Sequence, residues 1–175
     1  MTLARVRNGY EKFLEAVVIL LMTVLAAEVS IGVIFRSAGR SLVWYDEVAS
    51  ILLAWLTFYG SALAAAKRAH IGCPEVMAML APAARVALRL LADFLVIAFF
   101  ALVAWVGYSV MEVLATDSLV SLPGVPVNYV QSVIPVSAVL IIVAELLTLP
   151  HALALARAGR PGGEAGESAA KEVTH

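Results

Sequence analysis

The chain has 175 residues, of which 62% are hydrophobic and only 14% are charged. Soluble domains carry about 25% charged residues, so this composition excludes an ordinary water-soluble fold and indicates an integral membrane protein. The net charge of −1 gives no basic surface for nucleic acid, and the single cysteine excludes a disulfide within the chain.

Four apolar stretches follow one another along the sequence, each about as long as the roughly 20 residues of a membrane-spanning helix. They cover Phe13–Phe35, Asp46–Ala66, Val86–Tyr108 and Val130–Leu149. The first is too long for the apolar core of a signal peptide, so we expect it to remain as a helix. The predicted fold class is therefore all-α integral membrane, with four transmembrane helices in one domain over residues 1–158.

The connections between these stretches have different lengths and compositions. The first, Arg36–Tyr45, is short and contains Gly39. In the second, Pro74 is suited to the first turn of a helix and Pro82 to its end. The apolar residues between them predict a short interfacial helix, between the second and third spans, with its apolar side toward lipid.

The last two segments contain proline and glycine at informative places. Met111–Tyr129 is the longest connection and contains the turn signal Leu122-Pro123-Gly124. Pro126 is expected to start the fourth helix, and Pro135 to kink it. Residues 159–175 are rich in Gly, Glu and Ser without apolar periodicity, which predicts a disordered tail.

The positive charges predict the orientation in the membrane. Of the 12 Lys and Arg residues, only Arg36 and Arg40 lie in connections on one side. The other ten lie at the termini and around the second connection, so both termini should be cytoplasmic. Aromatic residues favour the opposite interface, as expected for membrane proteins, at Trp44, Tyr45, Trp105, Tyr108 and Tyr129.

Glu28 is a carboxylate inside the first span, where burial in hydrocarbon costs a few kcal/mol and indicates a role. It is either a proton or ion relay, or a polar contact within the chain or to another subunit. Arg89 and Asp93 have the i, i+4 spacing of an ion pair on one helix. Glu145, in the fourth span, either extends its carboxylate to the membrane surface or forms an ion pair with a basic residue.

Motifs for catalysis or for a bound cofactor do not emerge. His70 and Cys73 lie close together, but a zinc site needs about four ligands, and His151 is remote in sequence. Histidine is absent from the four spans, which argues against haem. We therefore expect no enzyme activity, no metal and no cofactor.

The second span has small residues four apart, a spacing that lets membrane helices approach closely. Its second half contains the pairs Gly60/Ala64, Ser61/Ala65 and Ala62/Ala66, and Trp55, Phe58 and Tyr59 precede them as bulky residues. This pattern favours a packed helix over a lipid-facing one and indicates a protein–protein surface.

Several of these residues occur in a recognisable order. The chain resembles the small membrane subunit, or Q subunit, of TRAP (tripartite ATP-independent periplasmic) transporters in Trp44-Tyr45-Asp46-Glu47, Trp55, Phe58, Gly60, Ala62, Lys67-Arg68 and His70-Ile71. The resemblance continues through Ser118, Leu122-Pro123, Tyr129 and Ile134-Pro135, and covers roughly residues 10–155. The chain departs from the family pattern at Gly72-Cys73-Pro74.

The resemblance implies a non-catalytic subunit in the inner membrane of a bacterial cell. Such a subunit is a scaffold for a large multi-span permease that carries an organic acid, such as a dicarboxylate, together with sodium. The expected interface with that permease comprises Glu28, Trp55, Tyr59, Gly60 and Ala64. A periplasmic substrate-binding protein is expected to dock at Arg36, Arg40, Asp46 and Glu47, while membrane lipid surrounds the rest.

Two alternatives remain at this point. A small four-helix multidrug antiporter would exchange protons through Glu28 in its first helix. An accessory subunit of some other membrane complex would also have four spans and little outside the lipid.

Overall fold

The computed structural model describes residues 2–40, 42–67 and 82–158. Four helices in these ranges are long and apolar enough to cross a membrane, which confirms the predicted fold class. The elements are α1 (Thr2–Ser37), α2 (Tyr45–Ala66), α4 (Pro82–Val113), the single 3-10 turn Leu114–Thr116, α5 (Val127–Gln131) and α6 (Val133–Ala158). The predicted interfacial helix, the disordered tail, His70 and Cys73 lie outside the described residues.

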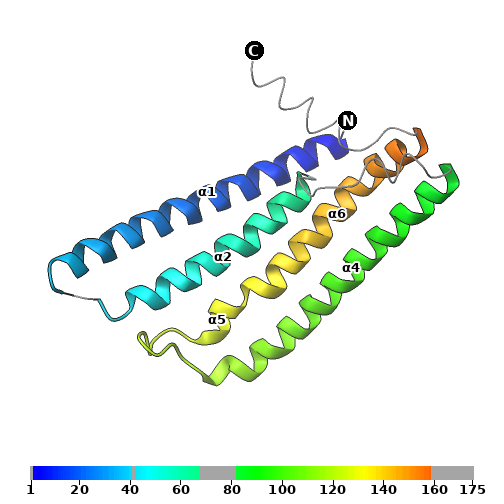
Figure 1. The fold of residues 1–175 in the computed structure, drawn as a ribbon. Helices are drawn as coiled ribbons and strands as arrows, with labels where there is room; N and C mark the ends of the chain where they lie inside the picture. The colour runs from blue at the N-terminus through cyan, green and yellow to red at the C-terminus, as the bar shows by residue number, and fades with distance from the viewer. Residues whose placement is uncertain (1, 41, 68–81, 159–175) are drawn as a thin grey trace, which may run out of the picture.

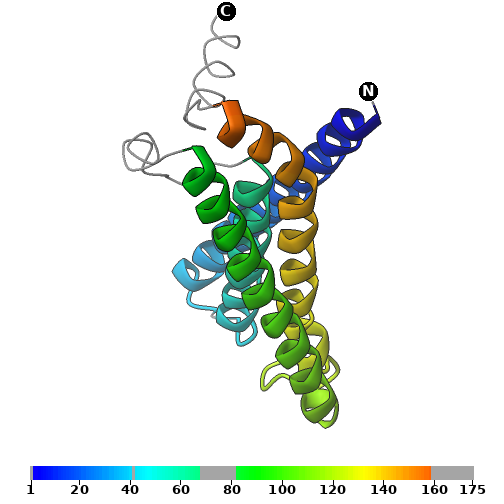
Figure 2. The same cartoon turned by 90° about the vertical axis from the view of Figure 1, so that its right-hand side faces the viewer.

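The long helices stand side by side in the order α1, α2, α6, α4 (Figure 1). The helix α6 thus inserts between α2 and α4, and α1 and α4 occupy the two ends of the row. Seen from the side of α4, α1 lies behind the other helices and crosses α6 at a clear angle (Figure 2). A row leaves both ends and both faces of the protein open to lipid or to a partner.

The small core lies where α1, α2 and α6 meet. It comprises Leu14, Ala62, Ala65, Ala66, Ile141 and Ala144, all buried. Alanine side chains let the helix backbones approach closely, which is how helices associate in lipid without a hydrophobic driving force. The Tyr10 hydroxyl adds a link between the two outer helices of this group, donating to the Leu140 carbonyl over 2.6 Å.

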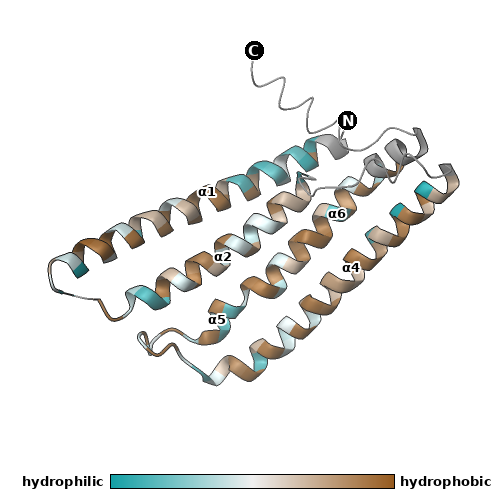
Figure 3. Ribbon diagram, viewed as in Figure 1, coloured by the Kyte–Doolittle hydropathy of each residue, from teal (hydrophilic) through white to brown (hydrophobic). Residues whose placement is uncertain are grey.

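Most large apolar side chains of α1 and α4 point away from the protein. The hydropathy colouring shows brown, apolar segments along the middle of every long helix (Figure 3). On α4 alone, Leu91, Phe94, Phe99, Leu102 and Trp105 are each more than half exposed. In a membrane this is a stable arrangement, because lipid tails solvate apolar side chains as well as a protein core does.

The beginning of the fourth span agrees with the prediction. Pro126 precedes the helix, and only Ser132, which keeps helical φ and ψ, separates α5 from α6. The Ser132 N–H donates to the Asn128 carbonyl and the Val136 N–H to the Ser132 carbonyl, so the helix continues across this position. Pro135 has no N–H to donate to the Gln131 carbonyl, and the loss of this one hydrogen bond is what a proline kink involves. Gly107 of α4 packs against this site, since a β-carbon there would lie 3.1 Å from Pro135 Cδ.

The helices are also longer than the apolar stretches. α1 begins at Thr2, α4 at Pro82 and α6 continues through Pro150 to Ala158. Pro82 is the first residue of α4, where a missing N–H has no consequence.

Candidate functional site

The exposed face of α2 differs in composition from that of α4. Its exposed residues recur at helical spacing on one side of the helix: Asp46, Ser50, Leu53, Ala54, Thr57 and Ser61. Leu53 is the one large apolar residue among them, whereas the exposed surface of α4 is dominated by Leu, Phe, Val and Trp. Lipid-facing surfaces are normally rich in large apolar side chains, and helix–helix interfaces in small ones.

The hydroxyl groups on this face are already satisfied. Thr57 donates to the Leu53 carbonyl over 2.8 Å, and Ser61 donates to the Thr57 carbonyl over 2.8 Å. Covering this face with another helix therefore leaves no donor without a partner, which would otherwise cost about 1–3 kcal/mol. We call the surface formed by the exposed α2 residues Asp46, Ser50, Leu53, Ala54, Thr57 and Ser61 the α2 face. Most of its side chains are small, and its hydroxyl groups donate to carbonyls of α2 itself.

The predicted interface residues on α2 fall into two groups. Trp55 and Tyr59 turn toward the rest of the chain: the Trp55 indole donates to the Val130 carbonyl over 3.0 Å, and Tyr59 packs on the core. Gly60 and Ala64 are half-buried, and a β-carbon added at Gly60 would meet nothing within 4 Å. Gly60 thus borders open space, where a partner has room to approach.

Glu28 lies on α1 toward the start of α2. Both of its carboxylate oxygens are covered and have no hydrogen-bond partner in the described part of the chain. Asp46 at the start of α2 is near enough for its charge to act on Glu28. One turn along α1, Gly32 is buried under the ring of Tyr45, and a β-carbon there would overlap that ring.

The four predicted docking charges are placed differently from one another. Arg36, Arg40 and Asp46 are exposed. The Glu47 carboxylate instead accepts hydrogen bonds from the backbone N–H of Ser121, at 2.9 Å, from that of Val120, at 3.2 Å, and from the Ser121 hydroxyl. No local sequence pattern signals this contact, because it joins residues more than 70 positions apart.

The partner of Glu47 is a small hairpin between the 3-10 turn and α5. Ser118 pairs with Pro126 in an isolated β-bridge, and the Leu119 N–H donates to the Val125 carbonyl over 3.0 Å. The Val125 N–H closes a turn on the Leu122 carbonyl at 2.9 Å, which confirms the predicted turn at Leu122-Pro123-Gly124. We call Ser118–Pro126 the external hairpin, after the side of the membrane that the distribution of positive charge predicts for it.

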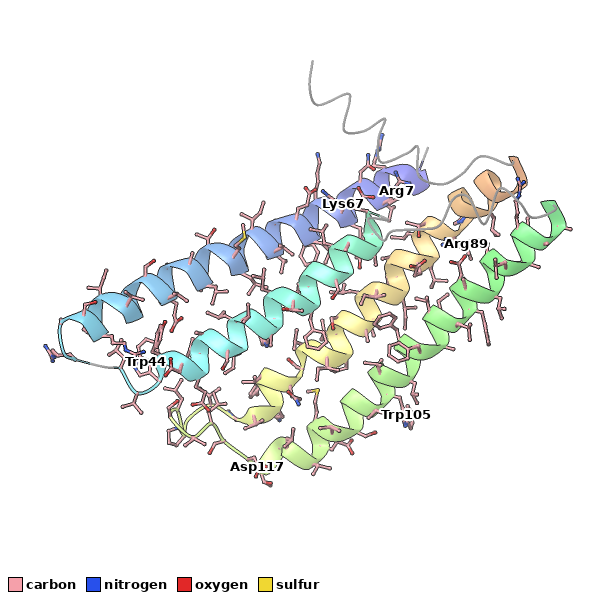
Figure 4. All side chains as sticks on the ribbon, in the orientation of Figure 1. Arg7, Trp44, Lys67, Arg89, Trp105 and Asp117 are labelled. Atoms are coloured by element: carbon pink, nitrogen blue, oxygen red, sulfur yellow. The ribbon has the colours of Figure 1, made fainter. Side chains whose placement is uncertain are left out.

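Charged contacts are concentrated at the opposite end of the helices. The predicted ion pair of Arg89 and Asp93 is confirmed, with Nη2 2.5 Å from Oδ1, and Glu145 of α6 is 3.8 Å from the same guanidinium. Lys67 at the end of α2 pairs with Glu15 of α1. Figure 4 shows Arg7, Lys67 and Arg89 toward this end and Trp44 and Asp117 toward the other.

The sequence was also compared with known protein families. The family model described as "Tripartite ATP-independent periplasmic transporters, DctQ component" matches residues 25–154, from the second half of α1 to near the end of α6. No curated protein matches the chain.

Proposed function

Because the chain belongs to the DctQ component family of tripartite ATP-independent periplasmic transporters, we propose that it is the small membrane subunit of a sodium-coupled transporter for organic acids such as dicarboxylates. Members of this family are components of a transporter, and we infer that the chain performs no catalysis itself. The substrate and sodium would be carried by the large permease subunit. In keeping with this, Asp93 and Glu145 of the present chain both lie next to Arg89 near the helix ends.

We propose that the chain supports the large subunit through the α2 face. The observation that carries this proposal is the contrast between α2, with one exposed large apolar residue, and α4, with many. Gly60 and Ala64, beside this face, add close-approach positions. Trp55 and Tyr59 lie on the side of α2 that packs within the chain. They would support the interface indirectly, by fixing α2 against α5 and the core.

Glu28 is the fifth interface candidate. Its covered carboxylate has no partner among the described residues, and a buried carboxylate without a partner is costly. A donor or cation supplied by the large subunit would remove this cost. This supports a role for Glu28 in contact with the partner.

A matched pair of alanine substitutions tests the interface. Ala54 on the α2 face and Ala98 on α4 are both exposed and both lie within spans. Ala54→Leu should reduce co-purification of the large subunit severalfold, because leucine prevents close approach, while Ala98→Leu should leave it unchanged. Both variants should insert normally, since leucine raises hydrophobicity. If the two variants co-purify the large subunit equally well, the interface with the large subunit lies on another surface of the chain.

We further propose that the periplasmic binding protein docks at the end carrying Arg36, Arg40 and Asp46. These three side chains are exposed, and exposed charges steer transient partners by raising the association rate. The same proposal places both termini in the cytoplasm of a bacterial cell, with the charge-rich helix ends on the inner side of the inner membrane.

A further inference from the structure

The external hairpin is held at its tip by a single side chain. An ionised carboxylate only accepts hydrogen bonds, and that of Glu47 receives two backbone N–H groups and one hydroxyl from Val120 and Ser121. Hydrogen bonds to a charged acceptor are stronger than those between neutral groups. The clamp therefore fixes the hairpin to the first turn of α2.

The two sides of the hairpin differ in chemistry. Its underside carries Leu119, Leu122 and Val125, which together with Val48, Ile51, Leu52 and Trp55 of α2 line an open apolar pocket of about 210 Å³. On the other side, the Val120 side chain is 93% exposed, more than any other large apolar residue among those described. The same clamp that anchors the backbone of Val120 thus presents its side chain outward.

The surroundings of Val120 favour a soluble protein partner over the membrane. Asp46, next to Glu47, and Asp117, at the base of the hairpin, are both exposed. Acidic groups at this position disfavour contact with anionic lipid headgroups. An apolar centre with a charged rim is instead the usual anatomy of a protein–protein interface.

We propose that the external hairpin is a docking element for the soluble binding protein, which receives Val120 in an apolar pocket bordered by basic residues. Glu47 acts as a positioning residue: its charge holds the hairpin and does not contact the partner. This inference rests on the proposed function, and it replaces a direct docking role for Glu47 with an indirect one.

Photo-cross-linking from the hairpin tests the contact in the assembled transporter. In a Cys73→Ser background, Val120→Cys carrying a benzophenone should cross-link to the binding protein when that protein is added to the membrane complex in nanodiscs. The matched control is Val113→Cys at the external end of α4, which is 76% exposed and should not cross-link. Cross-linking of Val120 to lipid or to the large subunit, or equal yields from both positions, would overturn the proposal.

A second measurement separates positioning from direct electrostatics. Glu47→Gln keeps one acceptor oxygen but loses the charge and the second oxygen, so the concentration of binding protein giving half-maximal uptake should rise roughly fivefold, which corresponds to about 1 kcal/mol of binding free energy. Maximal uptake should be unchanged. Because the hairpin itself is displaced, the Val120 cross-link should weaken and the defect should persist at high salt, which screens exposed charges.

The opposite result is equally informative. A Glu47→Gln defect that disappears at high salt, with the Val120 cross-link intact, would show that Glu47 meets the partner directly. If the wild-type chain does not co-purify with the large subunit, the proposed function itself is contradicted. Failure of the docking proposal and failure of the proposed function are therefore distinguishable.

Discussion

Gly32 is a position in the contact of α1 with α2 that leaves no room for a larger side chain. A β-carbon there would overlap the ring of Tyr45, and overpacking of this kind typically costs about 1–3 kcal/mol. Gly32→Ala should therefore lower the thermal unfolding temperature of the detergent-solubilised subunit.

Gly60 provides the matched control for that substitution. It lies in the neighbouring helix, and a β-carbon there meets nothing within 4 Å. Gly60→Ala should leave the unfolding temperature unchanged or raise it, because alanine is a better helix former by up to about 1 kcal/mol. A Gly32→Ala variant as stable as Gly60→Ala would mean that Tyr45 moves aside without cost.

Glu28 distinguishes a scaffold from a proton-exchange antiporter. An antiporter needs a carboxylate that gains and loses a proton, so Glu28→Gln would abolish its transport. In a scaffold subunit, glutamine retains the shape and the hydrogen-bonding capacity, and roughly half or more of the uptake should remain. The measurement is sodium-driven uptake by the reconstituted three-part transporter, with assembly checked by co-purification. Complete loss of uptake with normal assembly would contradict the scaffold role.

At the scale of elements, the connection between α1 and α2 carries the exposed cation Arg40. If this charge steers the binding protein, Arg40→Glu should lower uptake at limiting binding-protein concentration and be partly rescued by excess, because steering acts on the association rate. Arg40→Lys keeps the charge and serves as the control. Uptake curves for Arg40→Glu and wild type that overlap at every concentration would remove Arg40 from the docking surface.

The join between α5 and α6 shows the effect of one missing N–H. Pro135 was expected to lie within the fourth helix and to kink it, and its effect on the Gln131 carbonyl is a local one that a sequence predicts in kind. The helix continues across this position through the hydrogen bonds from the Ser132 N–H to the Asn128 carbonyl and from the Val136 N–H to the Ser132 carbonyl. The close approach of Gly107 to Pro135 was not predicted, because Gly107 lies on a different helix.

For the whole molecule, the distribution of charge makes the topology testable. Reporter fusions after Arg85 and after Lys171 should both report a cytoplasmic location, and a fusion within residues 116–119 an external one, because positive residues are retained inside. A cytoplasmic result for the fusion at 116–119 would reverse the orientation and remove both proposed docking elements from the periplasm.

The sequence by itself determined the number of spans, their approximate limits and the charge asymmetry between the two ends. These depend on composition over about 20 residues, since every backbone group in lipid must be satisfied within its own helix. The Arg89–Asp93 pair was equally predictable because both residues lie one turn apart on the same helix.

Only the tertiary structure decided which face of each helix is used within the chain. In α2 the small residues repeat on several faces: Ala62 and Ala66 are buried against α1 and α6, whereas Ala54 and Ser61 remain exposed. Helical spacing alone does not rank these faces, because lipid-exposed and protein-packed positions are both apolar. Glu47 was likewise predicted as a free docking charge. Its hydrogen-bond partners lie in a hairpin that is distant in sequence, so only the folding of that hairpin onto α2 reveals them.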